Sequence, residues 1–436
     1  MTDCDVVVIG LGPGGEAAAT KLAEAGLDVV GVDERLVGGE CPYYGCIPTK
    51  MMVHAAAQAG SSRPPWSQVA RRIRDEATDD WDDRVAVDRL EKAGITFVRG
   101  HGRLTGPRTV EVGGRTFRAA KGVLLNTGTA PAVPPIDGLA DTPYWTNQDA
   151  VRLEQLPATL AVIGGGAIGA ELAQVFARFG VEVTVLESAD RILAREEPEA
   201  GALVAEVFAA EGIRVRTGVR VERVGYDEGR FTVSVGGSTV HADKLLVATG
   251  RRTHLDDLGL DTVGLDPTAR TLEVDDRMRI GDGLWGIGDN TGKGAFTHVS
   301  MYQAAIAVRD VLGEDGPAAD YRALPRVTFT DPEVGSVGMT EEEAREAGLS
   351  VNVGTTDLAS ATRGWINEAR GLVKLVEDAD RGVLVGATSV GPCGGEVLSM
   401  LVTAVHAEVP VATLRSMIYA YPTFHRAVES ALDDLD

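Results

Sequence analysis

Residues 5–26, DVVVIGLGPGGEAAATKLAEAG, decide the fold that we expect for this chain. The stretch begins with an apolar run typical of a buried strand and continues with the apolar spacing of a helix. Glycines in a turn between a strand and a helix let the backbone approach a pyrophosphate at the helix N-terminus. The glycines of this turn are Gly10, Gly12, Gly14 and Gly15. A second strand over residues 27–33 completes a strand–helix–strand unit.

The same pattern returns at residues 160–187, LAVIGGGAIGAELAQVFARFGVEVTVLE. The residues of this second turn that we assign to nucleotide binding are Gly164, Gly166, Ile168 and Gly169. Asp33 and Glu187 lie at the same offset from the first glycine of each motif, where a carboxylate accepts hydrogen bonds from ribose hydroxyls. Two such units predict two dinucleotides and therefore electron transfer between a flavin and a nicotinamide.

The acid at the end of the second unit bears on which nicotinamide is used. Glu187 would bind the ribose diol of NAD and repel the 2′-phosphate of NADP. Arg191, four residues further on, would soften that preference. We expect NAD, with NADP possible.

Charge and composition exclude several classes of partner. The chain has 436 residues, 64 acidic against 42 basic, and a formal charge of -22. A surface of this sign repels nucleic acid and anionic membranes, so neither is expected as a partner. The sequence shows no signal-peptide pattern and no apolar run of membrane-spanning length, which predicts a cytoplasmic protein.

Residues 38–50, GGECPYYGCIPTK, hold two of the four cysteines. In a straight helix Cys41 and Cys46 would lie too far apart for a disulfide, but Pro42 and Gly45 favour a bent segment. Inert thiols and a metal site are the alternatives. A metal site would need further ligands, and no Cys or His cluster with zinc spacing is present. Two close cysteines in a cytosolic chain therefore favour redox chemistry.

The rest of the chain completes the predicted architecture, an α/β fold with two Rossmann-like units and a C-terminal α+β domain. Residues 108–118 and 230–241 alternate as hairpins do, and residues 60–83 are polar and predict a surface helix with loops. The α+β texture begins after residue 322.

Together these features resemble the pyridine nucleotide-disulfide oxidoreductases, the family of dihydrolipoamide dehydrogenase, glutathione reductase and mercuric reductase. GGECPYYGCIPTK is similar to the redox-active disulfide signature of that family. Further motifs in the family's order are TGTAP (127–131), ATGRR (248–252), GIGD (286–289) and TDPEVGSVGMTEEEA (330–344).

The resemblance implies a pathway in which NAD(P)H reduces FAD and the flavin reduces a Cys41–Cys46 disulfide. Cys46 would then lie next to the flavin, and Cys41 would attack the acceptor. Lys50 and Glu171 match positions that pair near the flavin N5, and Asp289 matches the residue that holds a ribityl hydroxyl. Other matched cofactor positions are Thr127, Gly128, Thr297 and His298 for FAD and Gly250 for NAD(P).

The resemblance also implies a domain order and a homodimer. It assigns residues 1–146 to an FAD-binding domain and 147–250 to an NAD(P)-binding domain. Residues 251–321 would return to the FAD domain, and 322–436 would form the dimerisation domain.

The C-terminal segment departs from the family. Where the pattern H-P-T-x-x-E supplies a His base and its Glu, this chain has Tyr421 and Arg426. Tyrosine, with an ordinary pKa of ~10, is a poor base near neutral pH, although it can donate a proton. His425 and Glu429 follow at helical spacing and offer a shifted dyad; the alternative is an interface histidine. Arg426 would attract an anionic acceptor or pair with an interface carboxylate.

We therefore expect an NAD(P)H-driven flavoenzyme that reduces a small disulfide or another soft electrophile. A mercuric-reductase-like or otherwise specialised, non-lipoamide reductase is the alternative within the family. A flavin-binding scaffold or redox-responsive interaction protein is the alternative of another class.

Overall fold

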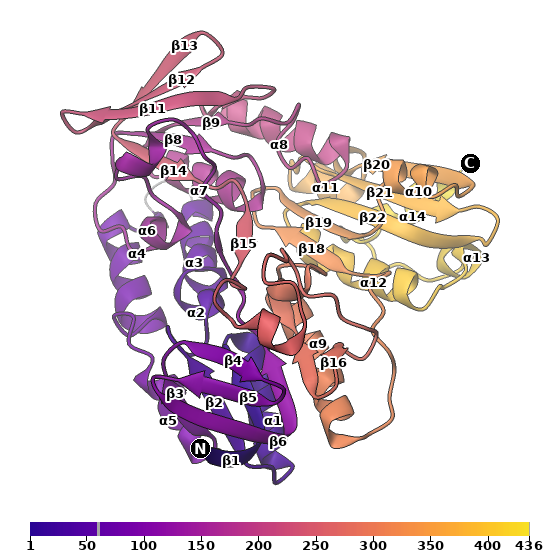
Figure 1. Cartoon of the computed structure of the whole chain (residues 1–436). Helices are drawn as coiled ribbons and strands as arrows, with labels where there is room; N and C mark the ends of the chain where they lie inside the picture. Colours follow the sequence, from indigo (N-terminus) through magenta and orange to yellow (C-terminus); the bar gives the residue numbers. More distant parts are fainter. Residues whose placement is uncertain (59–61, 436) are drawn as a thin grey trace. The chain divides into compact units, whose positions relative to one another are not determined.

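The structure is a computed structural model that describes residues 1–58 and 62–435 (Figure 1). The chain forms two compact units. The first contains Met1–Met51, Ser67–Ala132 and Arg251–Asp320; the second contains Met52–Trp66, Val133–Gly250 and Tyr321–Asp436. The division of the sequence into four segments at residues 146, 250 and 321 stays a prediction.

The first unit is built on an eight-stranded sheet with the order β16-β17-β6-β1-β2-β3. Strands β1, β2, β3, β6 and β17 run parallel; β5 pairs antiparallel with β6, and β4 pairs antiparallel with β5. Their bounds are β1 (Thr2–Ile9), β2 (Val29–Asp33), β3 (Thr96–Arg99), β4 (Gly102–Gly106), β5 (Thr109–Val112), β6 (Arg115–Leu125), β16 (Arg279–Gly281) and β17 (Leu284–Gly286). A separate two-stranded ribbon pairs β7 (Thr129–Pro131) with β15 (Arg251–Thr253).

The second half of the central strand β1, residues 6–9, is apolar because both of its faces are covered. Val6 and Val8 pack into one core with residues of α1 (Pro13–Glu24), α5 (Arg84–Lys92) and α9 (Thr297–Leu312). Val7 and Ile9 point to the opposite face, as alternate residues of a strand must, and pack against β4 to β6. This double burial explains the unbroken apolar run that opens the sequence.

The remaining helices of residues 1–132 connect these strands. They are α2 (Glu40–Tyr43), α3 (Cys46–Ala57), α4 (Trp66–Arg72), the π-helical turn η2 (Ile73–Ala77) and α5. Within residues 62–83 the helices α4 and η2 and their flanking loops agree with the predicted surface helix with loops, and most side chains are exposed or half-buried. Residues 60 and 61 lie outside the described residues, and Trp66, Ile73 and Thr78 are buried.

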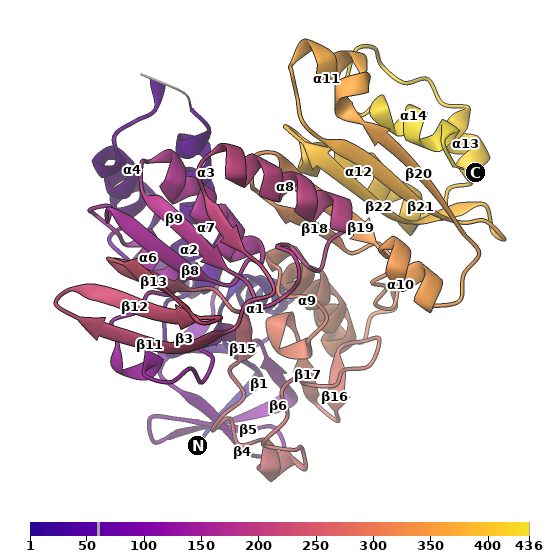
Figure 2. The same cartoon turned by 90° about the horizontal axis from the view of Figure 1, so that it is seen from above.

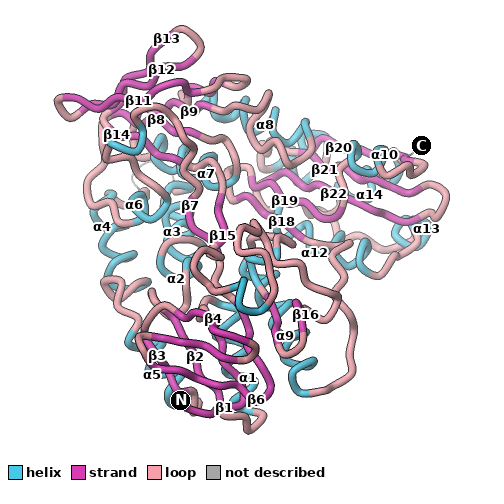
Figure 3. Tube along the Cα trace, in the orientation of Figure 1, coloured by secondary structure: helices cyan, strands magenta, loops and turns pink. Residues whose placement is uncertain are grey.

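The second unit contains a four-stranded parallel sheet with the order β10-β9-β8-β14. Its elements are β8 (Thr159–Ile163), α7 (Ala167–Arg178), β9 (Glu182–Leu186), α8 (Pro198–Ala210), β10 (Arg214–Arg216) and β14 (Lys244–Val247). An antiparallel sheet of β11 (Val221–Asp227), β12 (Arg230–Val235) and β13 (Ser238–Ala242) is drawn as strands joined by short loops in Figure 3. Both predicted hairpins, β5–β6 and β12–β13, are present.

The C-terminal part of this unit is a five-stranded antiparallel sheet with the order β18-β19-β22-β21-β20. The strands are β18 (Pro325–Thr328), β19 (Glu333–Gly338), β20 (Val351–Asp357), β21 (Leu372–Asp378) and β22 (Val383–Gly391). Figure 2 shows α12 (Gly394–His406), α13 (Val411–Arg415) and α14 (Ala427–Asp433) beside this sheet. Apolar side chains of these helices share a core with the sheet. The shorter helices α10 (Glu341–Glu346) and α11 (Thr362–Ile366) lie between strands. The predicted fold class, two Rossmann-like units and a C-terminal α+β domain, is confirmed.

A buried lysine ties this sheet to the start of α8. Val373 and Leu375 enter the apolar core, so Lys374 between them points to the other face of β21. The side chain of Lys374 is 3% exposed, and its Nζ lies 2.9 Å from carboxylate oxygens of Glu197, Glu199 and Glu341. Burial alone would lower the pKa of Lys374, but hydrogen bonds to the three carboxylates raise it. The ammonium therefore stays charged inside the unit.

We expect Lys374→Met to destabilise the protein by about 3–5 kcal/mol, because it leaves the buried Glu197 without its counter-charge. Urea unfolding of the purified variant measures the loss. As a matched control, Arg252→Met breaks an exposed pair with Asp256 and should cost no more than about 0.5 kcal/mol. Equal stability of the two variants would contradict this account of Lys374.

No helix in residues 1–58 and 62–435 is long and apolar enough to cross a bilayer.

Candidate active site

The first glycine turn joins β1 to α1 as the sequence predicts. Gly10 has a φ of +89°, and a Cβ there would lie 2.2 Å from the carbonyl oxygen of Asn126. A Cβ on Gly15 would lie 2.0 Å from the carbonyl oxygen of Gly10, so only glycine lets α1 pack this closely on the turn. Gly14 has a packing role as well, since a Cβ there would meet Ser300 of α9 at 2.1 Å.

The chemistry of this turn fits a dinucleotide. Gly12 is the N-cap of α1. Because glycine has no side chain, it cannot accept hydrogen bonds from the backbone N–H groups of the first helical turn, and these N–H groups can bind an anion. Asp33 accepts hydrogen bonds from the backbone N–H groups of Leu11 at 2.7 Å and Arg35 at 2.8 Å. Burial raises the pKa of Asp33, and these two hydrogen bonds oppose the rise. The carboxylate therefore lies against the glycine turn at the end of β2.

The second glycine turn joins β8 to α7 and repeats this construction. A Cβ on Gly169 would lie 2.0 Å from the carbonyl oxygen of Gly164, the same relation as in the first turn. Gly166 caps α7 without a side-chain hydrogen bond, and a Cβ there would meet nothing within 4 Å. Glu187 accepts from the N–H groups of Gly165 at 2.6 Å and Ala189 at 2.7 Å. This turn also fits a dinucleotide.

Other predicted positions for the nicotinamide nucleotide lie in the same unit. Ile168 is half-buried in the first turn of α7, and Gly250 is exposed just after β14. Arg191 is held by Asp190 at 3.2 Å and by the carbonyl oxygen of Ala194 at 3.2 Å.

The cysteine segment is bent where the sequence predicts. Helix α2 ends at Tyr43, and α3 begins at Cys46, so the chain turns through Tyr44 and Gly45. Cys41 and Cys46 are free thiols in this structure and lie within hydrogen-bonding reach of each other. Tyr43 is buried, which assigns it a packing role in the bend.

The two thiols have opposite electrostatic environments. The hydrogen bond from Cys41 lowers the pKa of Cys46 to about 6; partial burial opposes this, while Thr297 and Lys50 assist. The same hydrogen bond, together with burial, raises the pKa of Cys41. Near neutral pH the pair therefore holds one proton on Cys41 and a thiolate on Cys46.

The N-terminus of α9 contributes to this thiolate. Thr297 is the first residue of α9, and its Oγ1 lies 3.4 Å from the Sγ of Cys46. The positive end of a helix dipole favours a negative charge at this position. Lys50 lies one turn after Cys46 on α3, and its Nζ donates to Thr49 at 3.3 Å. His298, exposed at the same helix end, stacks on Phe296 with ring centroids 5.1 Å apart.

A polar chain connects Asp289 with the cysteine segment. Thr129 donates to Asp289 Oδ2 at 2.6 Å, and Arg251 donates to Thr129 Oγ1 at 2.6 Å. Arg251 also pairs with Glu40 at 3.3 Å, and Glu40 directly precedes Cys41. Burial raises the pKa of Asp289, opposed by Thr129 and Arg251. The ATGRR motif contains Arg251, but only the fold shows that it reaches Glu40.

The two other predicted flavin positions lie beside this chain. Gly128 has a φ of +66°, its carbonyl accepts from the N–H of His254 at 3.0 Å, and a Cβ there would meet nothing within 4 Å. Asn290 Nδ2 lies 3.5 Å from Thr127 Oγ1.

Glu171 is held by a turn of the C-terminal sheet. Its Oε1 accepts from the backbone N–H of Phe329 at 2.9 Å. One helical turn further, Gln174 exchanges two hydrogen bonds of 2.8 Å with the backbone of Asp331. Lys50 and Glu171 belong to different compact units, and their pairing near a flavin stays a prediction.

The C-terminal segment corrects one sequence expectation. Helix α14 begins at Ala427, so Tyr421 and His425 do not share a helical face, because Pro422 cannot continue a helix through this stretch. Glu429 pairs with Arg426 at 2.8 Å, whereas His425 Nε2 lies 3.5 Å from Thr423 Oγ1. The His425–Glu429 dyad offered by the spacing is therefore not formed in the described chain.

Tyr421 has partners of its own. It is 65% exposed, and its hydroxyl donates to Thr362 Oγ1 at 3.2 Å. The guanidinium of Arg426 lies over its ring at 5.5 Å from the centroid. Arg426 pairs with Glu429 of the same chain, so the two roles considered for it, attraction of an anionic acceptor and a pair with an interface carboxylate, stay predictions.

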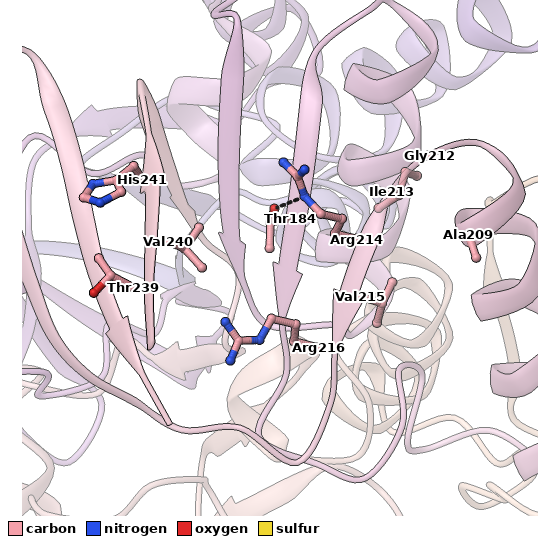
Figure 4. A pocket seen from close by; sticks show the side chains of 10 residues that line it. All are labelled: Thr184, Ala209, Gly212, Ile213, Arg214, Val215, Arg216, Thr239, Val240 and His241. Carbon is pink, nitrogen blue, oxygen red and sulfur yellow. Dashed lines mark hydrogen bonds between the residues drawn. The ribbon is translucent and has the colours of Figure 1, made fainter. Parts of the chain in front are cut away.

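A hollow of about 760 Å³ lies between β10 and β13 in the second unit (Figure 4). It contains Arg216 and His241, and Arg214 Nε donates to Thr184 Oγ1 at 3.2 Å along its wall. None of the predicted site residues lines it.

The fold and the dithiol define the class: a flavoprotein disulfide oxidoreductase. The family described as "Pyridine nucleotide-disulphide oxidoreductase" matches residues 4–307, and its dimerisation domain matches residues 324–432. The chain belongs to this family, and the prediction of an NAD(P)H:disulfide oxidoreductase-type enzyme is confirmed.

Three known proteins illustrate the relationship. Dihydrolipoyl dehydrogenase of Thermus scotoductus is 34% identical, with 100% of this chain and 98% of that protein covered. Mercuric reductase of Streptomyces lividans is 35% identical, with 99% and 96% covered. The Cu(II) complex of the HOCl-induced flavoprotein disulfide reductase RclA from Escherichia coli superposes with a TM-score of 0.90 at 29% identity, covering 99% of both chains.

We expect Thr297→Val to raise the pKa of Cys46 by about one unit, since a hydrogen bond to a charged group contributes about 1.5–3 kcal/mol. Because a raised pKa leaves less thiolate, alkylation of Cys46 below about pH 7 should slow. Thr297→Ser keeps the hydroxyl and serves as the control. If the pH dependence of Cys46 alkylation were the same in Thr297→Val as in the unmodified protein, the role assigned to the Thr297 hydroxyl would be contradicted.

Proposed function

We propose that the chain is an FAD-dependent, NAD(P)H-driven reductase that passes electrons through Cys41 and Cys46 to a small disulfide or another soft electrophile. The observation that carries the proposal is the position of Cys46: its Sγ lies 3.4 Å from the Oγ1 of Thr297, the first residue of α9, and Cys41 lies within reach on the same bent segment. FAD, when bound, would supply the electron pair received from NAD(P)H. Residues of the first unit proposed to hold it are Gly10, Gly12, Gly15, Asp33, Thr127, Gly128, Asp289, Thr297 and His298.

The nicotinamide nucleotide is proposed to lie at the second glycine turn, on Gly164, Gly166, Ile168, Gly169, Glu187 and Gly250. Both oxygens of Glu187 are fixed by backbone N–H groups, so the carboxylate is set for a ribose diol. Arg191 is occupied by Asp190 and Ala194, which supports NAD over NADP.

The dithiol can supply its own first base. Because the pKa of Cys46 lies below that of Cys41, the proton of Cys41 passes to Cys46 only as Cys41 attacks a disulfide R–S–S–R, and no free Cys41 thiolate forms beforehand. Attack forms a Cys41–S–S–R bond and releases RS⁻, which takes the proton from Cys46 and leaves as RSH. Cys46 then attacks the Cys41 sulfur, forms the Cys41–Cys46 disulfide and expels the second RS⁻.

This route suits the replacement of the family's His by Tyr421. In the direction of acceptor reduction, the proton needed by the first leaving thiol comes from the dithiol itself. In the reverse direction an external dithiol must lose its protons, and a positioned base typically contributes about 10²–10⁴-fold. We therefore propose that acceptor reduction is preferred over dihydrolipoamide oxidation.

An acceptor screen tests this proposal. NADH oxidation should be measured with lipoamide, glutathione disulfide, other small disulfides, mercuric ion and quinones, and repeated with NADPH. We expect turnover with a disulfide or soft electrophile, faster with NADH, that is lost in Cys41→Ser. Tyr421→His should raise dihydrolipoamide oxidation by about 10²-fold or more.

The screen also separates the alternatives. Turnover with mercuric ion alone would favour a mercuric-reductase-like function. Turnover retained in Cys41→Ser would contradict the dithiol pathway, and no turnover with any acceptor would favour the scaffold.

The dimerisation domain supports a homodimer as the working form. Several large apolar side chains of this domain are exposed: Trp365 (69%), Ile366 (51%), Met417 (43%) and Ile418 (98%). The hydrogen bond from Tyr421 to Thr362 connects the two segments that carry them. We propose that a second copy of the chain covers this surface.

We expect Ile418→Asp to convert the dimer to monomer, because it places a charge within an apolar contact. Light scattering after gel filtration measures the molecular mass. Val85→Asp, at an exposed valine of α5 in the other unit, is the matched control and should stay dimeric. A monomeric unmodified protein would contradict the proposal.

A further inference from the structure

Three consecutive residues before α5 have a backbone conformation that residues other than glycine rarely adopt. Their φ angles are 48° for Asp79, 56° for Asp80 and 58° for Trp81. Strain of this kind persists only where surrounding contacts over-determine the backbone. The contacts that hold this segment therefore indicate what it is for.

The segment is fixed at its start by the π-helical turn η2. Thr78 is 1% exposed, and its hydroxyl lies 3.1 Å from the carbonyl oxygens of both Ile73 and Arg74. The backbone N–H of Asp80 donates to the same carbonyl of Arg74 at 2.7 Å. Trp81 directly follows Asp80, so these hydrogen bonds fix the backbone from which the Trp81 side chain extends.

Trp81 reaches the cysteine segment. Its Nε1 donates to the carbonyl oxygen of Tyr43 at 3.2 Å. Tyr43 is the last residue of α2 and lies between Cys41 and Cys46. The last carbonyls of a helix have no partner within the helix, so the indole satisfies one of them.

Asp83 holds the other end of the same segment. Its Oδ2 accepts from the backbone N–H of Val37 at 2.6 Å and from Arg99 at 2.5 Å. Val37 is fully buried and directly precedes Gly38 and Gly39, which begin the turn into α2. Asp83 is itself 8% exposed, so the bond to Val37 is shielded from water.

We infer that Trp81 and Asp83 are positioning residues for the dithiol: they hold Tyr43 and Val37, on either side of Cys41, so that its thiol stays against Cys46. The inference rests on the proposed function. Helix α2 has only four residues and follows two glycines with positive φ, so it cannot hold its own shape. The charged and titratable groups that act on Cys46 directly are Cys41 and Lys50, with the Thr297 hydroxyl beside them.

The test is the pH dependence of Cys46 alkylation in the reduced full-length protein, followed by peptide mass spectrometry. Trp81→Phe keeps an aromatic ring and removes only the indole N–H. We expect the pKa of Cys46 to shift upward and its alkylation near pH 5, well below that pKa, to fall about fivefold, which is the effect of one ordinary hydrogen bond. Asp83→Asn keeps an oxygen that accepts from the backbone N–H of Val37 but loses the negative charge that faces Arg99. We expect it to raise the pKa of Cys46 as well, by less than Trp81→Phe does.

Trp66→Phe is the matched control. Trp66 Nε1 donates to the carbonyl oxygen of Leu153 at 2.8 Å, so this variant removes the same kind of bond away from the cysteine segment. Its alkylation profile should match that of the unmodified protein, whatever the change in melting temperature. A Trp81→Phe profile equal to that of Trp66→Phe would overturn the inference. An ordinary pKa for Cys46 in the unmodified protein would instead contradict the proposed function.

Discussion

The placement of Cys41 and Cys46 within reach of each other, with Cys46 Sγ 3.4 Å from Thr297 Oγ1, is the feature on which the proposed chemistry depends. It places the proton on one sulfur and the negative charge on the other, so a single pair provides a nucleophile, a base and a second nucleophile in turn. The N-terminus of α9 stabilises the charged sulfur through Thr297. The acceptor-facing role of Cys41 and the flavin-facing role of Cys46, which the family resemblance implies, stay predictions.

The fold keeps this pair in place from several directions. The glycine turn after β1 brings α1 against α9, whose first residue touches Cys46. The chain from Asp289 through Thr129 and Arg251 ends at Glu40, one residue before Cys41. The strained segment that carries Trp81 reaches the residues between the cysteines. A short and glycine-flanked segment thus gains rigidity from contacts with residues distant in sequence.

The features that sequence alone predicted are those encoded locally. Both glycine turns, the strands and helices around them, and the bend between the cysteines depend on neighbouring residues, and the structure contains them. The missed contacts join distant positions: no periodicity connects Trp81 with Tyr43 or Arg251 with Glu40. The expected helical face of Tyr421 and His425 was wrong because a spacing of four residues indicates one face only where a helix exists, and Pro422 prevents it there.

The central claim is that electrons from the nicotinamide nucleotide reach Cys46 through a bound flavin. Stepwise anaerobic addition of NADH to the purified protein and to Cys46→Ser, followed by absorbance, tests it most directly. The account predicts that the unmodified protein takes up electrons into the dithiol and develops a long-wavelength absorbance of a thiolate beside a flavin, which Cys46→Ser lacks. A flavin that NADH does not reduce, or identical spectra for the two proteins, would contradict it.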